Sequence, residues 1–192
     1  MREYSPLPLS PLAPRARVAE TAAFDRVTLD DPAFAVMTDL REVRAATTTA
    51  ETPVDQAHAL MLHRGVRLLF VLDREAAITG VLTASDLLGE KPMRLAGGRG
   101  VTHAELVVAD LMTPAERLDA LLVQDVSQMR VGHIVATLKS VRRQHLLVAE
   151  ADAKRVRGIF SATQIARQLG VVLQTFEVAQ TFADIEAVLA RT

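Results

Sequence analysis

The sequence contains no cysteine, no tryptophan and only one tyrosine among its 192 residues. Without cysteine it can form no disulfide, no thiolate nucleophile and no zinc site with sulfur ligands, which fits a reducing compartment. Aromatic residues make up 4% of the chain, which disfavours a nucleic-acid surface that stacks bases on aromatic rings. The formal net charge is −1, so no overall field attracts nucleic acid or an anionic membrane.

Long apolar runs are also missing. No stretch approaches the ~20 consecutive apolar residues that span a bilayer, so we expect a cytoplasmic protein outside the membrane. Four of the eight prolines lie near the N-terminus, at positions 6, 8, 11 and 14, where they interrupt the apolar run that a signal peptide needs. Because proline fixes φ and has no N–H, we expect residues 1–32 to form an extended arm and lead-in.

What the sequence does contain is an internal repeat. Three short blocks recur in the same order about 75 to 78 residues further along the chain. The pairs are Val36-Met37-Thr38-Asp39 with Leu111-Met112-Thr113-Pro114, Phe70-Val71-Leu72-Asp73 with Leu147-Val148-Ala149-Glu150, and Gly80-Val81-Leu82-Thr83-Ala84-Ser85-Asp86 with Gly158-Ile159-Phe160-Ser161-Ala162-Thr163-Gln164. Ordered repetition predicts two copies of a unit of roughly 55–60 residues.

Both copies have the same predicted local structure. In the first, Thr52 is expected to cap a helix that has Pro53 at its first position and stops at Gly65. Apolar runs predict strands at 68–72 and 78–82, and a short helix follows at 83–89. The second copy repeats this plan with a helix at 129–138, strands at 146–149 and 156–160, and a helix at 161–169. Weaker opening strands near 43–47 and 118–123 give the order β-α-β-β-α twice.

The segments outside the repeat complete the predicted organisation. Gly97-Gly98-Arg99-Gly100 predicts a flexible loop, since no Lys-Ser/Thr follows as in a phosphate-binding loop. A stripe of apolar residues after Gly170 predicts an amphipathic helix that covers its own domain or another subunit: Phe176, Ala179, Phe182, Ile185 and Leu189. The expected parts are an arm (1–32), a first unit (33–92), a linker (93–106), a second unit (107–170) and a C-terminal helix (171–192).

The repeated pattern resembles a known family. The pattern consists of Met-Thr, then a helix, then an apolar strand ending in Asp or Glu, and then Gly-h-h-Thr/Ser-x-x-Asp, where h is an apolar residue. This pattern is similar to a CBS domain. Two copies in tandem resemble a CBS pair, or Bateman module, over about residues 33–169. The resemblance implies an α/β (α+β) fold of two β-α-β-β-α units related by pseudo-twofold symmetry. It also implies frequent dimerisation and a regulatory role. The implied ligand contains adenosine (AMP, ADP, ATP or S-adenosylmethionine) and binds between the units.

The resemblance assigns ligand contacts to Thr83 and Asp86. Thr83 lies where a strand turns into a helix, whose free N–H groups favour a phosphate, and Asp86 can accept hydrogen bonds from both ribose hydroxyls. The adenine would lie against strand residues such as Val81. The same residues also fit a capping box that needs no ligand, so both interpretations stay open. The second copy is expected to contribute the loop residues Arg142, Arg143, Gln144 and His145, with the two arginines equally consistent with a solvated surface pair.

The second copy departs from the family pattern. Gln164 replaces the aspartate and loses the charge-assisted pair of hydrogen bonds, so we expect a weaker or empty cleft lined by Ser161, Gln164, Ile159 and Arg67. Ser161 and Gln164 also fit a capping box. Many family members have proline where this chain has Phe70 and Leu147. Phe70 would either stack on a base or block the pocket.

No motif indicates catalysis or a metal site. Gly-x-Ser-x-Gly and His-x-x-x-His are absent, and we interpret His58 and His133 as helix-surface or interface residues. We therefore predict a stand-alone regulatory module, without a required cofactor, that forms a homodimer and signals to a separate partner protein. The alternative is a structural or interaction dimer with degenerate, ligand-free clefts. A third interpretation, disfavoured by the interspersed acids Glu150 and Asp152, is a nucleic-acid binder using Arg142, Arg143, Lys154, Arg155 and Arg157.

Overall fold

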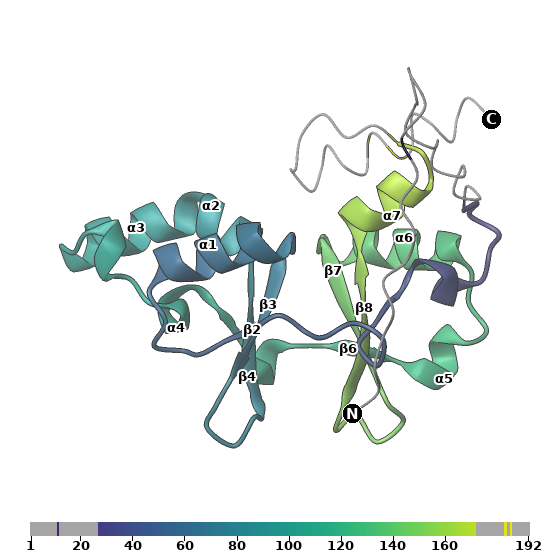
Figure 1. The fold of residues 1–192 in the computed structure, drawn as a ribbon, viewed down its shortest axis with the longest axis horizontal. Coiled ribbons are helices and arrows are strands. Elements are labelled where there is room, and N and C mark those ends of the chain that lie inside the picture. The colour runs from purple at the N-terminus through teal and green to yellow at the C-terminus, as the bar shows by residue number, and fades with distance from the viewer. Residues whose placement is uncertain (1–10, 12–26, 172–182, 184, 186–192) are drawn as a thin grey trace.

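The computed structural model describes residues 27–171 together with residues 11, 183 and 185. Within them, two four-stranded β-sheets lie next to each other, each with its own set of helices (Figure 1). The mixed α/β class and the two units predicted from the sequence are thereby confirmed.

The order of the elements repeats between the halves. The first half contains η1 (Ala33–Val36), β1 (Thr38–Asp39), β2 (Thr47–Thr48), α1 (Val54–Arg64), β3 (Leu68–Leu72), β4 (Ile78–Thr83), α2 (Ala84–Leu88), α3 (Glu90–Arg99) and η2 (His103–Glu105). The second half contains α4 (Val108–Leu111), β5 (Thr113–Pro114), η3 (Ala115–Arg117), β6 (Ala120–Leu122), α5 (Val123–Val126), α6 (Val131–Ser140), β7 (His145–Ala149), β8 (Val156–Ser161) and α7 (Ala162–Gln168).

Each sheet contains one edge strand from the other half. The first sheet has the order β2-β3-β4-β5, and the second has the order β1-β8-β7-β6. β1 pairs antiparallel with β8, with Thr38 opposite Ile159, while β5 pairs antiparallel with β4, with Thr113 opposite Val81. The two halves are therefore interlocked by strand exchange, which fixes the space between them.

An ion pair holds the exchanged strand β1. Arg157 on β8 donates from Nε to Asp39 Oδ1 at 2.8 Å and from its terminal nitrogen to the other carboxylate oxygen. These hydrogen bonds, with a further one from the backbone N–H of Arg41, lower the pKa of Asp39 to about 2. A bidentate pair of this kind adds directional strength to a strand of only two residues.

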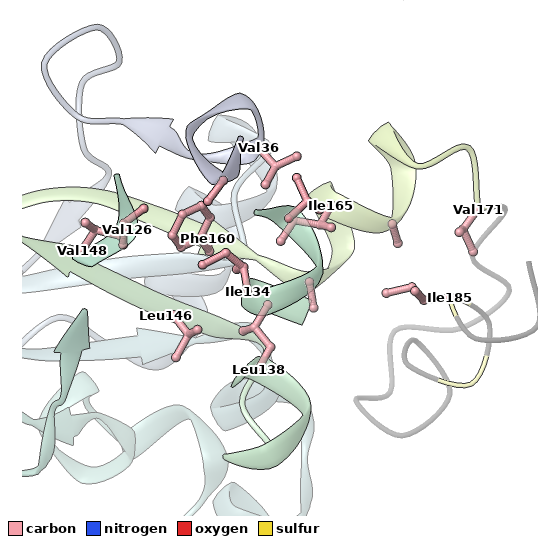
Figure 2. Packing of buried hydrophobic residues seen from close by; sticks show 14 residues of the cluster. Val36, Val126, Ile134, Leu138, Leu146, Val148, Phe160, Ile165, Val171 and Ile185 are labelled. Atoms are coloured by element: carbon pink, nitrogen blue, oxygen red, sulfur yellow. The ribbon is translucent and has the colours of Figure 1, made fainter. Parts of the chain in front are cut away.

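Three hydrophobic clusters form the core. The cluster of the second half surrounds Phe160, and Figure 2 shows Val36 from η1 packed into it beside Ile165. The cluster of the first half likewise receives Leu106, which lies just before α4, and Leu111 from α4 of the second half. A third, smaller cluster lies between the sheets and contains Leu68, Phe70, Val81 and Leu147. Packing thus crosses the sequence boundary between the repeats in the same way as strand pairing does.

Most of the predicted elements are present. β3 has the predicted bounds, and β4, β7 and β8 lie within one residue of theirs. Each β-hairpin has a register irregularity, between Val71 and Leu72 in β3 and between Val148 and Ala149 in β7. The repeat therefore extends from sequence to fine backbone geometry. The opening strands differ from the prediction: β2 has two residues and overlaps the predicted 43–47 only at Thr47, whereas β6 has three residues within the predicted 118–123.

Two local predictions are wrong. Thr52 does not cap α1: the cap residue is Pro53, in an extended conformation, and the Thr52 hydroxyl lies 3.2 Å from that of Thr49. Gly97, Gly98 and Arg99 do not form a loop, because α3 continues through them and ends at Gly100, whose φ is +67°. Each helical glycine costs about 1 kcal/mol relative to alanine. An ion pair from Arg99 to Asp110 on α4 opposes that cost.

The predicted arm and C-terminal helix lie outside the described residues, apart from residues 11, 27–32, 171, 183 and 185. Of these, Val171 and Ile185 are buried in the cluster around Phe160 (Figure 2). Among the helices that the structure describes, none has the length and apolar character needed to cross a membrane.

Candidate functional site

A cavity of about 260 Å³ opens between the two halves at the start of α2. Its wall contains every residue that the sequence assigned to the first cleft: Val81, Thr83, Asp86, Arg142, Arg143, Gln144 and His145. The first three come from β4 and α2, and the others come from the α6–β7 loop and the start of β7. Two segments about 60 residues apart in sequence thus face one space, which agrees with the expected cleft between units.

Thr83 and Asp86 form a complete capping box. Asp86 Oδ2 accepts hydrogen bonds from the Thr83 N–H at 2.9 Å and from its hydroxyl at 2.6 Å, and the Asp86 N–H donates back to Thr83 Oγ1 at 3.3 Å. The other carboxylate oxygen, Oδ1, lies 3.9 Å from Lys91 Nζ. The capping interpretation is therefore confirmed for this copy. The box engages one carboxylate oxygen, and the long contact to Lys91 leaves lone pairs on the other available to a ligand.

The opposite wall of the cavity is cationic and polar. Arg143 pairs with Asp119 at 3.1 Å, and Asp119 itself lines the cavity. Gln144 is buried, and its Oε1 accepts a hydrogen bond from Ser85 on α2 at 3.5 Å, the limit for such a bond. This contact joins the two halves across the cavity.

Arg142 has a backbone conformation that is unusual for a residue with a side chain. Its φ is +52°, in the left-handed region, and it follows the end of α6. The matching position after α1 is Gly65, with φ +62°. Both positions have the same hydrogen bonds: Gly65 and Arg142 donate to Leu62 and Lys139, and the next residues donate to Met61 and Leu138. An arginine thus stands where this type of helix end favours glycine, and its side chain is directed to the cavity wall.

His145 lines this cavity and also the neighbouring one described below. Its Nδ1 is buried and has no hydrogen-bond partner among the residues that the structure describes. Burial, with the positive charge of Arg67, lowers the pKa of His145 from 6.5 to about 4. The ring is therefore neutral at physiological pH, and it places an unsatisfied polar atom between the two cavities.

An apolar surface completes the first cavity. It is formed by Leu68, Leu118 and Leu147 beside the expected Val81. Phe70, for which stacking and blocking were both considered, lies instead in the cluster between the sheets and contributes to neighbouring cavities. Sequence reasoning missed Ser85, Thr113, Leu118 and Asp119. Of these, Ser85 lies inside the quoted Thr83–Asp86 motif, while Asp119 and Thr113 carry no pattern that links them to a cleft.

The second cleft is a cavity of about 160 Å³. It is lined, as expected, by Ser161, Gln164, Ile159 and Arg67. The predicted capping box of Ser161 and Gln164 is absent: Ser161 makes no side-chain cap, and Gln164 Oε1 instead accepts a hydrogen bond from Thr38 on β1 at 3.1 Å. The longer glutamine side chain reaches the exchanged strand rather than folding back on its own helix terminus.

The basic residues considered for nucleic-acid binding do not form one continuous group. Arg142 and Arg143 precede β7, whereas Lys154, Arg155 and Arg157 follow it, and five residues of strand span about 17 Å. Arg143, Arg155 and Arg157 each have a carboxylate partner, namely Asp119, Glu150 and Asp39.

His58 and His133 lie on helices, as their interpretation as helix-surface residues requires. His133 accepts the Arg130 N–H at its Nδ1 at 3.1 Å, at the start of α6, and His58 is half-buried on α1. Over the described ranges, no three His, Asp or Glu side chains cluster in a way that could hold a metal ion.

Comparison with known proteins finds a family match in the first half and similar structures for both halves. Residues 27–92 match the family model of the CBS domain. A conserved protein from Pyrococcus horikoshii has a similar structure, with 21% identity, coverage of 78% of this chain and all of its own, and a TM-score of 0.56. A CBS-domain-containing protein from Agrobacterium tumefaciens is also similar, with 17% identity, coverage of 67% of this chain and 88% of its own, and a TM-score of 0.52.

A third structure, of CBSX2 from Arabidopsis thaliana in complex with AMP, has 24% identity, covers 71% of this chain and 94% of its own, and has a TM-score of 0.49. A sequence search of the curated proteins finds no match. The family match in the first half and the shared architecture of both halves lead to one conclusion. Residues 27–92 match the CBS domain, and the two halves together have a fold similar to that of a CBS-domain-containing protein.

Proposed function

We propose that this protein is a regulatory module that binds an adenosine-containing ligand (AMP, ADP, ATP or S-adenosylmethionine) in the cavity at Asp86 and signals its occupancy to a separate partner protein. One observation carries the proposal: a single cavity between the halves combines two carboxylates, two arginines and an apolar wall. Its volume of about 260 Å³ is slightly below the range for ligand pockets, about 300–1,000 Å³.

The chemistry of the wall matches the parts of such a ligand. The oxygen Oδ1 of Asp86 is available to accept hydrogen bonds from ribose hydroxyls, because the capping box uses Oδ2. The apolar side chains Leu68, Val81 and Leu147 suit the face of a purine. Arg142 suits a phosphate or a carboxylate, since a guanidinium offers a planar set of donors to such groups. The strained backbone of Arg142 is of the kind that proteins retain at binding sites.

Signalling follows from the position of the cavity. Its walls belong to different halves, and the hydrogen bond between them, from Ser85 to Gln144, is long at 3.5 Å. A ligand that contacts both walls would add stronger contacts across this junction and favour one separation of the halves. A partner that distinguishes this separation would then sense occupancy, because a ligand shifts an equilibrium by its differential affinity for the two states.

A second candidate is a structural or interaction dimer whose clefts hold no ligand. The observation that favours it is the completed capping box, since Asp86 already has a structural role without any ligand. In that case Arg142 and Arg143 serve as solvated surface residues.

A titration of the full chain with AMP, ADP, ATP, S-adenosylmethionine and NAD separates the two candidates. We expect saturable binding of at least one adenosyl ligand by isothermal calorimetry, with a matching rise in the unfolding temperature. Arg94→Gln removes one positive charge from the exposed surface of α3, outside the cavity, and serves as a control for the effect of net charge on binding. No binding at millimolar concentrations of any of the five compounds would favour the ligand-free dimer.

A further inference from the structure

The two cavities differ in charge. The Asp86 cavity has the carboxylates of Asp86 and Asp119 in its wall together with Arg142 and Arg143. The smaller cavity at Gln164 has three arginines and one histidine in its wall, Arg44, Arg67, Arg167 and His145, and the described residues place no carboxylate there. Among the described residues, one cleft therefore has a wall of mixed charge, and the charged groups in the wall of the other are all basic.

The basic groups of the smaller cavity act on one another. Partial burial and the charge of Arg167 lower the pKa of the Arg67 guanidinium, and burial with the charge of Arg67 lowers that of His145. Positive charges that repel one another in a partly desolvated space create a positive electrostatic potential there. Arg44 and Arg167 are exposed and have no carboxylate within 4 Å in the part of the chain that the structure describes, so no ion pair there offsets their charges.

Several polar groups of this cavity are able to donate hydrogen bonds to a ligand. Gln164 Oε1 is occupied by the Thr38 hydroxyl, which leaves the Gln164 amide N–H groups to face a ligand. The Ser161 hydroxyl makes no cap bond, and His145 Nδ1 is a buried polar atom with no partner within the described residues. Among the described residues, no carboxylate lines this cavity to accept hydrogen bonds from a ribose. The wall therefore selects for negative charge rather than for a sugar.

We infer that the Gln164 cavity binds an anion that carries a diphosphate group, and that it does so without requiring a nucleoside. Three guanidinium groups match the several negative oxygens of a diphosphate better than the one phosphate of a monoester. The volume of about 160 Å³ also favours a compact anion over a whole nucleotide. This site lies beyond the function proposed above, which concerns the Asp86 cavity alone.

The inference is tested by calorimetric titration of the full chain with inorganic pyrophosphate, in magnesium-free buffer at physiological salt. We expect saturable binding that is at least about tenfold tighter than that of orthophosphate. Arg167→Gln, at an exposed position on α7, should weaken pyrophosphate binding by about ten- to a hundredfold while the melting temperature stays the same. Arg94→Gln removes the same charge from the exposed surface of α3 and should leave binding unchanged.

A competition experiment identifies the source of the diphosphate. It also separates the diphosphate site at Gln164 from the adenosyl-ligand site at Asp86. If ADP enters this cavity through its diphosphate, it competes with pyrophosphate, and the competition is lost in Arg167→Gln but persists in Asp86→Ala. If it does not compete, the site is specific for the free anion. AMP binding should respond to Asp86→Ala and not to Arg167→Gln, so failure of either site leaves the other measurable.

Three results would overturn the inference: no pyrophosphate binding at millimolar concentration, equal affinities for orthophosphate and pyrophosphate, or equal losses in Arg167→Gln and Arg94→Gln. The last result would indicate nonspecific attraction to surface charge, which salt screens strongly.

Discussion

Asp86 combines a structural role in the capping box with a proposed role in ligand binding, and one substitution separates the two roles. Asp86→Ala removes the carboxylate half of the capping box, so we expect the free energy of unfolding to fall by about 1 kcal/mol. If Asp86 also holds a ribose, the same change should weaken ligand binding by about ten- to a hundredfold. Thermal unfolding without ligand measures the first effect, and a ligand titration at low temperature measures the second.

Gln164→Ala is the matched control for this experiment. It occupies the equivalent position of the second copy, makes no capping box and pairs with Thr38. It should therefore change adenosyl-ligand affinity much less than Asp86→Ala does. An Asp86→Ala protein that melts earlier but binds as tightly as the parent would assign Asp86 to capping alone.

Arg142 is expected to lower the stability of the fold through its backbone and to strengthen ligand binding through its side chain. Because its φ of +52° suits glycine, Arg142→Gly should raise the free energy of unfolding by about 1 kcal/mol. The same change should weaken binding of an anionic ligand such as ATP, since the guanidinium is lost. Denaturant unfolding and calorimetry measure these two quantities.

Arg142→Ala separates the two causes. Alanine removes the guanidinium but keeps the Cβ that disfavours positive φ, so it should weaken ATP binding without adding stability. Unchanged ATP affinity in both variants would show that Arg142 is a solvated surface residue.

His145 gives the fold a specific pH dependence. The pKa of its ring is about 4 in the folded protein and 6.5 ordinarily, because of burial and the charge of Arg67. Between these values the unfolded chain binds a proton that the folded chain does not, so stability is full above pH 6.5 and falls as the pH drops towards 4. The loss should be about 1 kcal/mol for each pH unit within this window.

His145→Gln tests this linkage, because glutamine cannot take up the proton. We expect the stability difference between variant and parent to change between pH 7 and pH 5 in favour of the variant, as measured by urea unfolding. Parallel stability curves for the two proteins would contradict a buried neutral histidine.

At the scale of elements, the exchanged strands depend on two glycines. A Cβ at Gly80 would lie 2.6 Å from the backbone oxygen of Thr113 on β5, whereas a Cβ at Gly158 would meet the flexible side chain of Met37 at 2.6 Å. Backbone in a paired strand cannot move away as a thioether can. Gly80→Ala should therefore destabilise the protein by about 1–3 kcal/mol, and clearly more than Gly158→Ala.

Denaturant unfolding of both variants checks this difference. Equal losses of stability would mean that β5 is no more firmly held on β4 than the Met37 side chain is held on β8.

Prediction from the sequence succeeded where the pattern was local. The apolar runs of β3, β4, β7 and β8 are continuous and bounded by turns, so their positions follow directly. The exchanged strands β1 and β5 have two residues each, too few for any periodicity, and their partners are distant in sequence. The helix through Gly97 and Gly98 was missed because its stability depends on a contact from Arg99 to the next helix.

The candidate site shows the same division. Thr83 and Asp86 belong to a repeated motif, and Arg142 and Arg143 follow from the resemblance of the loop position. Arg44 and Arg167, which make the second cavity basic, carry no motif and meet only through the tertiary fold. For that reason the sequence predicted a weak copy of the first cleft, whereas the structure contains a cavity of different charge.

At the scale of the whole molecule, strand exchange and the cavities are linked. β1 and β5 tie each half to the sheet of the other, and the Asp86 cavity receives Thr113 from β5 while the Gln164 cavity receives Thr38 from β1. A ligand in either cavity would therefore act on the joint that holds the halves together. A ligand at a hundredfold excess over its dissociation constant would stabilise the fold by about 2.7 kcal/mol.

Two large apolar side chains on α1 and α2 are exposed and could be buried by a second copy of the chain. Leu62 on α1 and Leu88 on α2 are 71% and 65% exposed, and these helices are neighbours (Figure 1). Burial of a leucine side chain contributes about 1.5–3 kcal/mol, and a twofold contact buries each residue twice. We therefore expect a homodimer that uses the α1–α2 surface.

Sedimentation over a range of concentrations tests the dimer. The parent should sediment at twice the chain mass of 20.9 kDa and dissociate on dilution, and the double variant Leu62→Glu, Leu88→Glu should be a monomer, because charged side chains resist burial without a partner. Ala151→Glu, at the exposed turn between β7 and β8, adds a negative charge away from α1 and α2 and should leave the dimer intact. A parent protein of 20.9 kDa at every concentration would refute the dimer, whereas a dimer that survives both leucine substitutions would place its interface on another surface.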